Sequence, residues 1–420
     1  MKQFSKISVV GLGYIGLPTA AVFAQHGIDV IGVDVNKYAV DTINQGKIHI
    51  VEPDLDKAVQ ECVEKGSLKA TLAPEGADAF LIAVPTPFKG DDYEPDLSYI
   101  ESASKAIAPV LKKGDLVILE STSPVGVTEQ MAQWLAESRP DLTFPQNAGE
   151  SSDIRIAHCP ERVLPGQVMR ELIDNDRIVG GMTDKCSEQA VALYKTFVKG
   201  DCIVTNARTA EMCKLTENSF RDVNIAFANE LSIICDELDI NVWELIALAN
   251  RHPRVNILQP GCGVGGHCIA VDPWFIVNKT PDLAKIIHTA RLVNDSKPEW
   301  VIGKVHEAVI EALQKTGKSI QDIKIACLGL AFKPDIDDLR ESPALKITEK
   351  LADKYVGQIL AVEPNVEELP KKLADKNISL ISVGEVLKVA DVVVVLVDHK
   401  EFKKIHFNKG QSIVDTKGIV

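Results

Sequence analysis

The chain has 420 residues, too many for a single hydrophobic core, which predicts two or three domains. Apolar residues make up 45% of it and charged residues 25%, the balance of an ordinary globular protein rather than a disordered one. The formal net charge of -13 at pH 7 repels polyanions, so we expect neither a nucleic acid nor an anionic membrane as partner.

The start of the chain passes from a few polar residues directly into the apolar run ISVV at 7–10. This leaves no room for a signal peptide and predicts a cytoplasmic protein. The nine cysteines form no CxxC pair, and in a reducing compartment their odd number favours free thiols over disulfides. The longest apolar run, at 392–397, is far shorter than the ~20 residues that span a bilayer, and we interpret it as a buried strand.

Short apolar runs alternate with amphipathic stretches in the first part of the chain, which predicts a parallel sheet wrapped by helices. The expected strands are ISVV, VIGVD, AFLIAV, LVILES, RIAHCPE and RIVGG, and a helix is expected at LPTAAVFAQHG. From about residue 205 the pattern predicts a long helix through 234 and then a second helix at NVWELIALANR. Strand-like runs restart with IKIACLGL, ILAVE, VVVVLV and SIVD.

This pattern predicts an α/β fold: two Rossmann-like domains with doubly wound, mostly parallel sheets, joined by a central helical segment. We place the N-terminal Rossmann domain at 1–204, the central helical domain at 205–305 and the second Rossmann-like domain at 306–420. Because central helices of this kind often pack against a copy of themselves, we expect a homodimer.

A dinucleotide-binding motif follows the first predicted strand. Gly11, Gly13 and Gly16 form a GxGxxG between that strand and a helix, where glycines permit a tight turn and the helix N-terminus faces a pyrophosphate. Further along, Asp34 ends the second strand, and its carboxylate suits ribose hydroxyls but repels a 2′-phosphate. We therefore predict NAD as the cofactor. The alternative is a glycine turn with a surface aspartate.

Two later loops are expected to line the same edge of the sheet, because ligands of open α/β sheets bind beyond the carboxyl ends of the strands. VPTPFKG offers Thr86, and ESTSPVGVT offers Thr122 and Thr128. Hydroxyl groups in such loops serve loop structure as readily as ligand binding, so the residues by themselves leave both interpretations open.

The glycine-rich segment PGCGVGGHCIAVDPWF places Cys268 on a loop and is followed by Asp272. A thiol needs a cation, a helix N-terminus or a metal to become a good nucleophile. The segment EMCKLTENSFRDVN offers cations, because Lys214, Asn218 and Arg221 fall at i, i+4 and i+7 on one helix face. The alternatives are an ordinary buried thiol and a solvated charged stripe.

A metal at this loop is a weaker interpretation. Cys262, His267, Cys268 and Asp272 are zinc ligands by type, but their spacing matches no closed tetrahedral motif. We therefore predict no metal.

The ordered motifs GLGYIGLP, VPTP, ESTSPVG, CPERVLPG, EMCKLTENSFRDVNIAFANE, PGCGVGGHC and GLAFKPDIDDLRESP resemble those of the NAD-dependent UDP-sugar and GDP-sugar dehydrogenases. The resemblance covers essentially the whole chain. It implies oxidation of a sugar's C6 alcohol to an acid, with the second Rossmann-like domain binding the UDP-sugar. Val271 stands where the UDP-glucose branch carries a lysine, so the chain is more similar to the UDP-N-acetylhexosamine branch. The sequence leaves the stereochemistry at C2 open.

The resemblance implies a four-electron mechanism in which Cys268 captures the C6 aldehyde as a thiohemiacetal. Its oxidation gives a thioester that water hydrolyses. Five further residues are implied in catalysis: Lys214, Asn218, Asp272, Glu161 and Thr122. Lys214 and Asn218 are expected to stabilise the oxyanion, and Asp272 to orient or activate water. Glu161 is expected to assist thioester hydrolysis, with Thr122 positioning the water.

Binding residues are implied in the same way. Those for the substrate are Arg162, Val163, Lys214, Asn218, Arg221, His252, Arg254, Gly265, Phe332 and Lys333. Those for NAD are Gly11, Gly13, Tyr14, Ile15, Gly16, Asp34, Thr86, Thr128 and Arg340. Arg340 precedes Ser342 and Pro343, a predicted helix N-cap and first helical position. Without the family pattern, each arginine could equally form a surface salt bridge.

Two other functions fit parts of the sequence. A two-electron hydroxyacid dehydrogenase shares the GxGxxG and the central helix, uses Lys214 as its base and releases one NADH per turnover. A regulatory protein that binds NAD without catalysis is the other. Neither explains the loop at Cys268 together with a second nucleotide-type domain.

Overall fold

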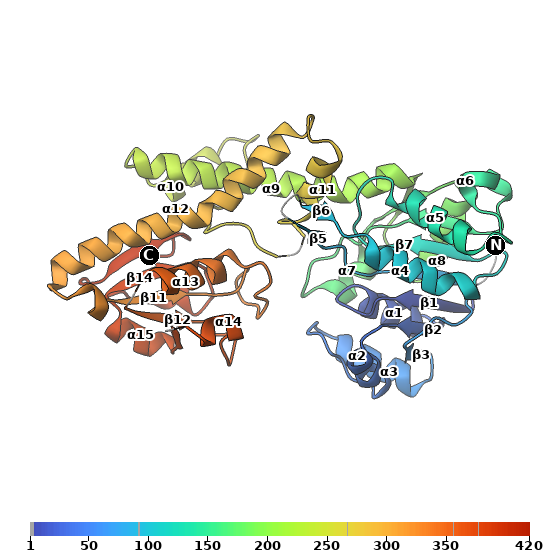
Figure 1. Cartoon of the computed structure of the whole chain (residues 1–420), viewed down its shortest axis with the longest axis horizontal. Helices are drawn as coiled ribbons and strands as arrows, with labels where there is room; N and C mark the ends of the chain where they lie inside the picture. The colour runs from blue at the N-terminus through green and yellow to red at the C-terminus, as the bar shows by residue number, and fades with distance from the viewer. Residues whose placement is uncertain (1–3, 91–92, 267, 356, 377) are drawn as a thin grey trace. The chain divides into compact units, whose positions relative to one another are not determined.

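The computed structural model describes residues 4–90, 93–266, 268–355, 357–376 and 378–420 (Figure 1). The chain forms two compact units, Met1–Glu217 and Asn218–Val420, and each unit contains its own parallel sheet. The α/β class with two Rossmann-like sheets is therefore confirmed. Among the described residues, no helix combines the length and apolar character needed to cross a membrane.

The sheet of the first unit has the order β10-β9-β8-β7-β4-β1-β2-β3 and is parallel except between β8 and β9. Its strands are β1 (Lys6–Val10), β2 (Asp29–Val33), β3 (Leu68–Thr71), β4 (Ala79–Ile82), β7 (Leu116–Leu119), β8 (Arg155–His158), β9 (Arg177–Gly181) and β10 (Cys202–Asn206). The six predicted strands are present. The two that the sequence did not predict, β3 and β10, are edge strands with partly exposed side chains, so they lack a continuous apolar run.

Helices cover both faces of this sheet (Figure 1). They are α1 (Gly16–Gln25), α2 (Lys37–Asn44), α3 (Leu55–Glu64), α4 (Ser98–Ile107), α5 (Val127–Ser138), α6 (Pro145–Ala148), α7 (Val168–Asp174) and α8 (Asp184–Tyr194). Successive strand residues point to opposite faces, so Val9 joins the core under α1 while Val10 joins the core under α4 and α5. A short antiparallel pair, β5 (Phe88–Lys89) and β6 (Glu94–Pro95), follows β4.

The sheet of the second unit is wholly parallel and has the order β13-β12-β11-β14-β15. Its strands are β11 (Lys324–Leu328), β12 (Gln358–Val362), β13 (Ile378–Leu380), β14 (Val392–Val395) and β15 (Ser412–Asp415). Helices α12 (Lys285–Thr316) and α13 (Pro343–Lys354) pack on one face, and α15 (Val383–Val389) packs on the other. A short α14 (Lys371–Ala374) precedes β13. The order reverses between β11 and β14, as it does between β1 and β4, which is where doubly wound sheets bind ligands.

The central helices are α9 (Ala207–Glu237), α10 (Val242–Ala249), α11 (Asp272–Lys279) and the 32-residue α12. The predicted helix at 205–234 corresponds to α9, whose first eleven residues belong to the first unit. Within the second unit, buried polar bonds join α9 to α12: Arg291 donates to Asp222 at 2.6 Å, and Asn229 donates to Asn294 at 2.8 Å. These bonds hold α9 and α12 together.

Candidate active site

The glycine turn after β1 fits a dinucleotide pyrophosphate. Gly11 has a φ of +92°, and a Cβ there would lie 2.6 Å from the carbonyl oxygen of Ala83. A Cβ on Gly16 would collide with the carbonyl of Gly11. A Cβ on Gly13 would meet nothing within 4 Å, so open space lies before the N-terminus of α1, where backbone amides favour an anion. The half-buried Tyr14 and Ile15 complete the turn.

Asp34 lies directly beside this turn. Its carboxylate accepts hydrogen bonds from the amides of Leu12 at 2.9 Å and Asn36 at 2.8 Å, and it stays half-exposed toward solvent. The sequence did not point to His49, which also faces Asp34. Burial lowers the pKa of His49 against the attraction of Asp34, so the ring is neutral at pH 7. The Asp34 carboxylate thus offers an acceptor for the ribose hydroxyls of NAD, and the glycine turn offers backbone amides for its pyrophosphate.

The two threonine loops lie side by side, as predicted, because β4 and β7 are neighbours. Thr86 donates from Oγ1 to the carbonyl oxygen of Thr122 at 2.5 Å. Thr128 is fully buried and donates from Oγ1 to Glu211 at 2.6 Å. Glu211 also accepts the amide of Gly126, so the hydroxyl of Thr128 helps to hold the start of α5.

Glu161 lies in the loop after β8 and is 9% exposed. Its carboxylate accepts the amide of Arg162 at 2.7 Å and Nη2 of Arg177 at 2.9 Å. The guanidinium of Arg162 pairs with Glu217 at 2.7 Å, and Val163 is half-buried.

The following part of this loop is held by Glu52, which is 5% exposed. Glu52 accepts the amides of Gly166 at 2.9 Å and Val168 at 2.8 Å. The sequence contains no local sign of this contact, because Glu52 is more than 110 residues away in the chain.

Helix α9 carries Lys214, Asn218 and Arg221 at the predicted spacing. Lys214 is half-buried, Asn218 is buried and Arg221 is exposed, so the three side chains differ in their environments.

In the second unit, the loop before α11 presents Cys268. None of the nine cysteines forms a disulfide, and Cys268 is the exposed one among them, all nine lying in the described ranges. Its carbonyl oxygen accepts the amide of Asp272 at 2.8 Å. The Asp272 carboxylate is 3% exposed and accepts Nδ2 of Asn218 at 2.5 Å. The structure thus brings together three of the predicted catalytic residues.

The glycines of this loop have a packing role. A Cβ on Gly265 would lie 2.7 Å from Cβ of Phe332 and 2.7 Å from Cδ of Pro343. The amide of Gly266 donates to the carbonyl oxygen of Arg340 at 3.3 Å. The loop therefore lies tightly on the segment after β11 and the start of α13. This brings Gly265, Phe332 and Arg340 together.

Other predicted residues lie on exposed surface. His252 and Arg254 occupy the turn after α10, and Lys333 follows β11. Arg340 is exposed and forms a bidentate pair with Asp338. Across the described ranges, no three His, Cys, Asp or Glu side chains form a set able to hold a metal ion, and His267 lies outside those ranges.

The second sheet repeats the turn geometry of the first. Gly329 has a φ of +94°, and its amide donates to Val362 at 2.8 Å, as that of Gly11 donates to Val33 at 2.8 Å. Glu363 accepts the amide of Leu330 at 2.7 Å, as Asp34 accepts that of Leu12.

Unlike Asp34, the acid of the second sheet is covered. Glu363 is 4% exposed, and Nε2 of the buried His399 lies 3.0 Å from its carboxylate. Its carboxylate therefore supports the turn from within the fold.

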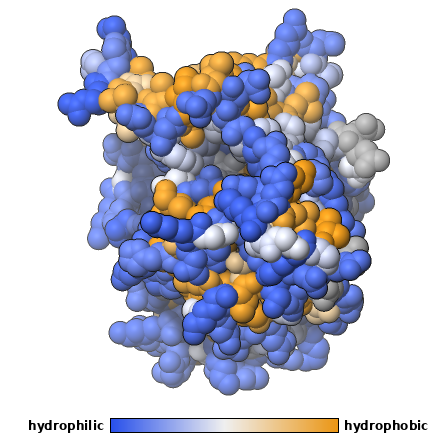
Figure 2. All heavy atoms as spheres, turned by 90° about the vertical axis from the view of Figure 1, so that its left-hand side faces the viewer, coloured by the Kyte–Doolittle hydropathy of each residue, from blue (hydrophilic) through white to orange (hydrophobic). Residues whose placement is uncertain are grey.

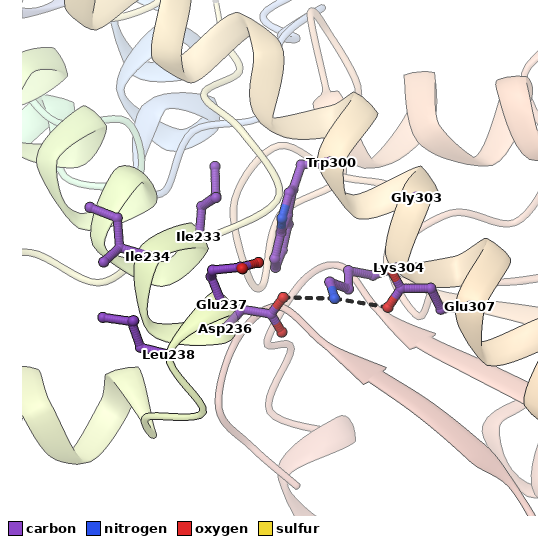
Figure 3. A pocket seen from close by; sticks show the side chains of 9 residues that line it. All are labelled: Ile233, Ile234, Asp236, Glu237, Leu238, Trp300, Gly303, Lys304 and Glu307. Carbon is purple, nitrogen blue, oxygen red and sulfur yellow. Dashed lines mark hydrogen bonds and ion pairs between the residues drawn. The ribbon is translucent and has the colours of Figure 1, made fainter.

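A groove of about 580 Å³ lies between α9 and α12 in the second unit (Figure 3). Its lining is Ile233, Ile234, Asp236, Glu237, Leu238, Trp300, Gly303, Lys304 and Glu307. Within this lining, Lys304 forms ion pairs with Asp236 at 2.7 Å and with Glu307 at 2.8 Å.

One face of the molecule is largely hydrophilic, with separate hydrophobic areas between the charged side chains (Figure 2).

Exposed apolar side chains continue along α9. Phe220, Phe227 and Ile234 recur every seven residues and are 69%, 53% and 44% exposed. This spacing places them in one stripe along the helix.

Three family models match the chain in succession. The NAD binding domain of the UDP-glucose/GDP-mannose dehydrogenase family matches residues 5–198, the central domain matches 208–296 and the UDP binding domain matches 326–420. The chain therefore belongs to the UDP-glucose/GDP-mannose dehydrogenase family. It is an NAD-dependent oxidoreductase with a domain for the UDP moiety, which confirms the predicted class and cofactor.

Relatives with more specific names are similar over the full length. A UDP-N-acetyl-D-mannosamine dehydrogenase of Yersinia pestis is 69% identical over 419 residues, 99% of each chain. One from Campylobacter jejuni is 69% identical over 97% of this chain and 99% of its own. The solved structure of the UDP-D-ManNAc dehydrogenase from Pyrococcus horikoshii has a TM-score of 0.88 at 40% identity, covering 99% of this chain and 96% of that chain.

Proposed function

We propose that the protein oxidises the C6 alcohol of UDP-N-acetyl-D-mannosamine to UDP-N-acetyl-D-mannosaminuronate in two NAD-dependent steps. The observation that carries the proposal is the exposed Cys268 on the loop that leads into α11, next to the buried Asn218–Asp272 pair. The choice of sugar rests on the names of the relatives, which are 69% identical over almost the whole chain.

The chemistry at C6 depends on covalent capture. NAD, when bound, supplies the hydride acceptor for both oxidations. Sγ of Cys268 bonds to the aldehyde carbon while the carbonyl oxygen takes up a proton, which forms a thiohemiacetal. Loss of hydride from C6 and of the hydroxyl proton to solvent then gives a thioester. Water then bonds to the thioester carbon, the C–S bond breaks and the electron pair leaves on sulfur. Capture keeps the aldehyde from diffusing away or hydrating before the second oxidation.

The polar residues have separate tasks. The Asn218 amide uses one N–H on Asp272 and has a second for the oxyanion. Lys214 contributes positive charge to the same oxygen. Asp272 orients water for hydrolysis, and Glu161 accepts the proton that this water loses, with Thr122 positioning it.

The residues that bind NAD and the UDP-sugar are assigned from the family motifs. The NAD residues are Gly11, Gly13, Tyr14, Ile15, Gly16, Asp34, Thr86, Thr128 and Arg340. The UDP-sugar residues are Arg162, Val163, Lys214, Asn218, Arg221, His252, Arg254, Gly265, Phe332 and Lys333. Phe332 and Lys333 follow β11, beside the point where the order of the second sheet reverses, which supports their assignment.

The domain assignment is part of the proposal: an NAD domain at 1–204, a central domain at 205–305 and a UDP-sugar domain at 306–420. The central domain associates as a homodimer through α9, which the exposed stripe of Phe220, Phe227 and Ile234 supports. The protein works in the cytoplasm, a compartment that suits nine cysteines without a disulfide.

A stoichiometric NADH assay tests this function with UDP-ManNAc, UDP-GlcNAc, UDP-glucose and GDP-mannose. We expect two NADH to be released per UDP-ManNAc, and we expect slower turnover with each of the other three sugars. One NADH per sugar would favour a two-electron dehydrogenase, and unchanged absorbance with every sugar would favour a regulatory NAD-binding protein. Cys268→Ser is expected to lose acid formation, while Cys202→Ser in the first unit serves as the matched control. Full acid formation by Cys268→Ser would refute the covalent step.

A further inference from the structure

A buried charged network lies behind Glu161 in the first unit. Arg177, at the start of β9, is 4% exposed and donates from Nη2 to Glu161 at 2.9 Å. The other oxygen of Glu161 accepts the amide of Arg162 at 2.7 Å. Both oxygens of the carboxylate are therefore held, and its orientation is set largely by Arg177.

Arg177 is itself fixed by aromatic side chains. Its guanidinium lies 4.6 Å from the ring centroid of Tyr194 and 5.6 Å from that of Phe197. Such contacts stabilise a cation that has been removed from water. The guanidinium is therefore enclosed by two aromatic rings as well as by Glu161.

A second carboxylate faces the same cation. Glu120 directly follows β7, is 2% exposed and accepts the hydroxyl of Tyr194 at 2.6 Å. The charged and titratable groups around it are Arg177 on β9, Tyr194 on α8, and Cys159 and Glu161 after β8. Burial raises the pKa of the Cys159 thiol to about 12, so Cys159 stays neutral near pH 7. Burial raises the pKa of Glu120 to about 7, although the charge of Arg177 opposes this. Glu120 therefore changes charge near neutral pH.

Stability does not account for this arrangement. Removing one cation and two carboxylates from water costs desolvation free energy, and an apolar cluster of similar volume would avoid this cost. The network also contacts, through Glu161, a loop that carries the substrate residues Arg162 and Val163 assigned above.

We propose that Arg177 is the positioning residue for Glu161 in thioester hydrolysis, and that Glu120 adjusts how strongly Arg177 holds that carboxylate. This inference rests on the function proposed above. Arg177 keeps Glu161 oriented as the water oxygen bonds to the thioester carbon and one water proton passes to Glu161. Ionised Glu120 competes with Glu161 for Arg177 and leaves the Glu161 carboxylate freer to accept the proton of water, whereas protonated Glu120 does not.

Rapid-mixing kinetics with UDP-ManNAc and NAD test the role of Arg177. Arg177→Lys keeps the positive charge but loses the planar guanidinium group that donates to Glu161. We expect a burst of NADH near the wild-type rate, followed by hydrolysis slowed by up to about 100-fold. Mass spectrometry of the quenched enzyme is expected to find the acyl adduct on Cys268. Equal slowing of the burst and the steady state without an adduct would overturn the proposal. Arg208→Lys, an exposed arginine of the same unit, is the control.

The isosteric Glu120→Gln variant tests the role of Glu120. The variant is expected to fold, because its side-chain carbonyl still accepts the hydroxyl of Tyr194. Wild-type hydrolysis is expected to rise as the pH passes through about 7, and this rise is expected to be absent in Glu120→Gln. An unchanged pH profile would contradict the role of Glu120. If the wild-type enzyme fails to release two NADH from UDP-ManNAc, the proposed function is refuted. If the wild-type enzyme releases two NADH but both variants behave as wild type, only the inference about Arg177 and Glu120 is refuted.

Discussion

Nδ2 of Asn218 donates to Oδ2 of Asp272 at 2.5 Å, although 54 residues separate the two in the chain. Both side chains are buried, and the Asp272 amide in turn donates to the carbonyl oxygen of Cys268. The contact therefore links the Cys268 loop to α9 within the second unit. It also orients the Asn218 amide.

Replacing Asn218 by aspartate tests this link. In Asn218→Asp two carboxylates face each other at hydrogen-bond distance, so one must take up a proton and the donor to the oxyanion is lost. We expect kcat to fall by about 100-fold with little change in the KM for NAD. Asn224→Asp, on the same helix, is the control for the change of charge. Equal losses in both variants would remove Asn218 from the catalytic set.

Asp34→Asn tests the NAD site. The amide oxygen can still accept the Leu12 amide, so the glycine turn is expected to stay folded, but the charged acceptor for the ribose is lost. A hydrogen bond to a charged group contributes about 1.5–3 kcal/mol, so we expect NAD to bind roughly 10-fold to 100-fold more weakly. We also expect less discrimination against NADP. Titration calorimetry with both cofactors measures this, and Asp29→Asn on the exposed start of β2 is the control.

Glu363 predicts an acid-dependent loss of stability. Although burial opposes the charge, hydrogen bonds from His399 and the Leu330 amide lower its pKa from 4.5 to about 2. A depressed pKa stabilises the fold above the ordinary value, and this contribution is lost as the pH falls from about 4.5 toward 2. It amounts to at most about 3 kcal/mol.

We expect Glu363→Gln to lower the urea midpoint of the second unit's transition at pH 7 and to approach wild type near pH 3. The exposed Glu367→Gln controls for the lost charge. A constant difference between Glu363→Gln and wild type across this pH range would show that the carboxylate charge is irrelevant.

Phe227→Asp tests the homodimer. Phe227 lies in the middle of the exposed stripe on α9, where a charge at an apolar interface would be desolvated. Sedimentation at several protein concentrations is expected to show a dimer for wild type and a monomer for this variant. Val389→Asp, exposed on α15, is expected to leave the dimer intact. A dimer that survives Phe227→Asp would place the interface elsewhere.

The sequence by itself determined the local features. ISVV, GxGxxG and Asp34 lie within one strand–turn–helix–strand segment, so periodicity and glycine chemistry predict their arrangement without knowledge of distant residues. The accessible loop at Cys268 and the long α9 follow from equally local patterns. The edge strand β3 was missed because its partly exposed residues lack such a pattern.

The tertiary structure alone decided which polar side chains meet. Arg177 reaches Glu161, Tyr194 reaches Glu120, and Glu52 holds the loop after Glu161, each through contacts between distant parts of the chain. It also showed that Gly265 is needed where the loop packs on Phe332. A side chain's periodicity records whether it faces the core. Its partner there depends on how strands and helices far apart in the chain are packed together.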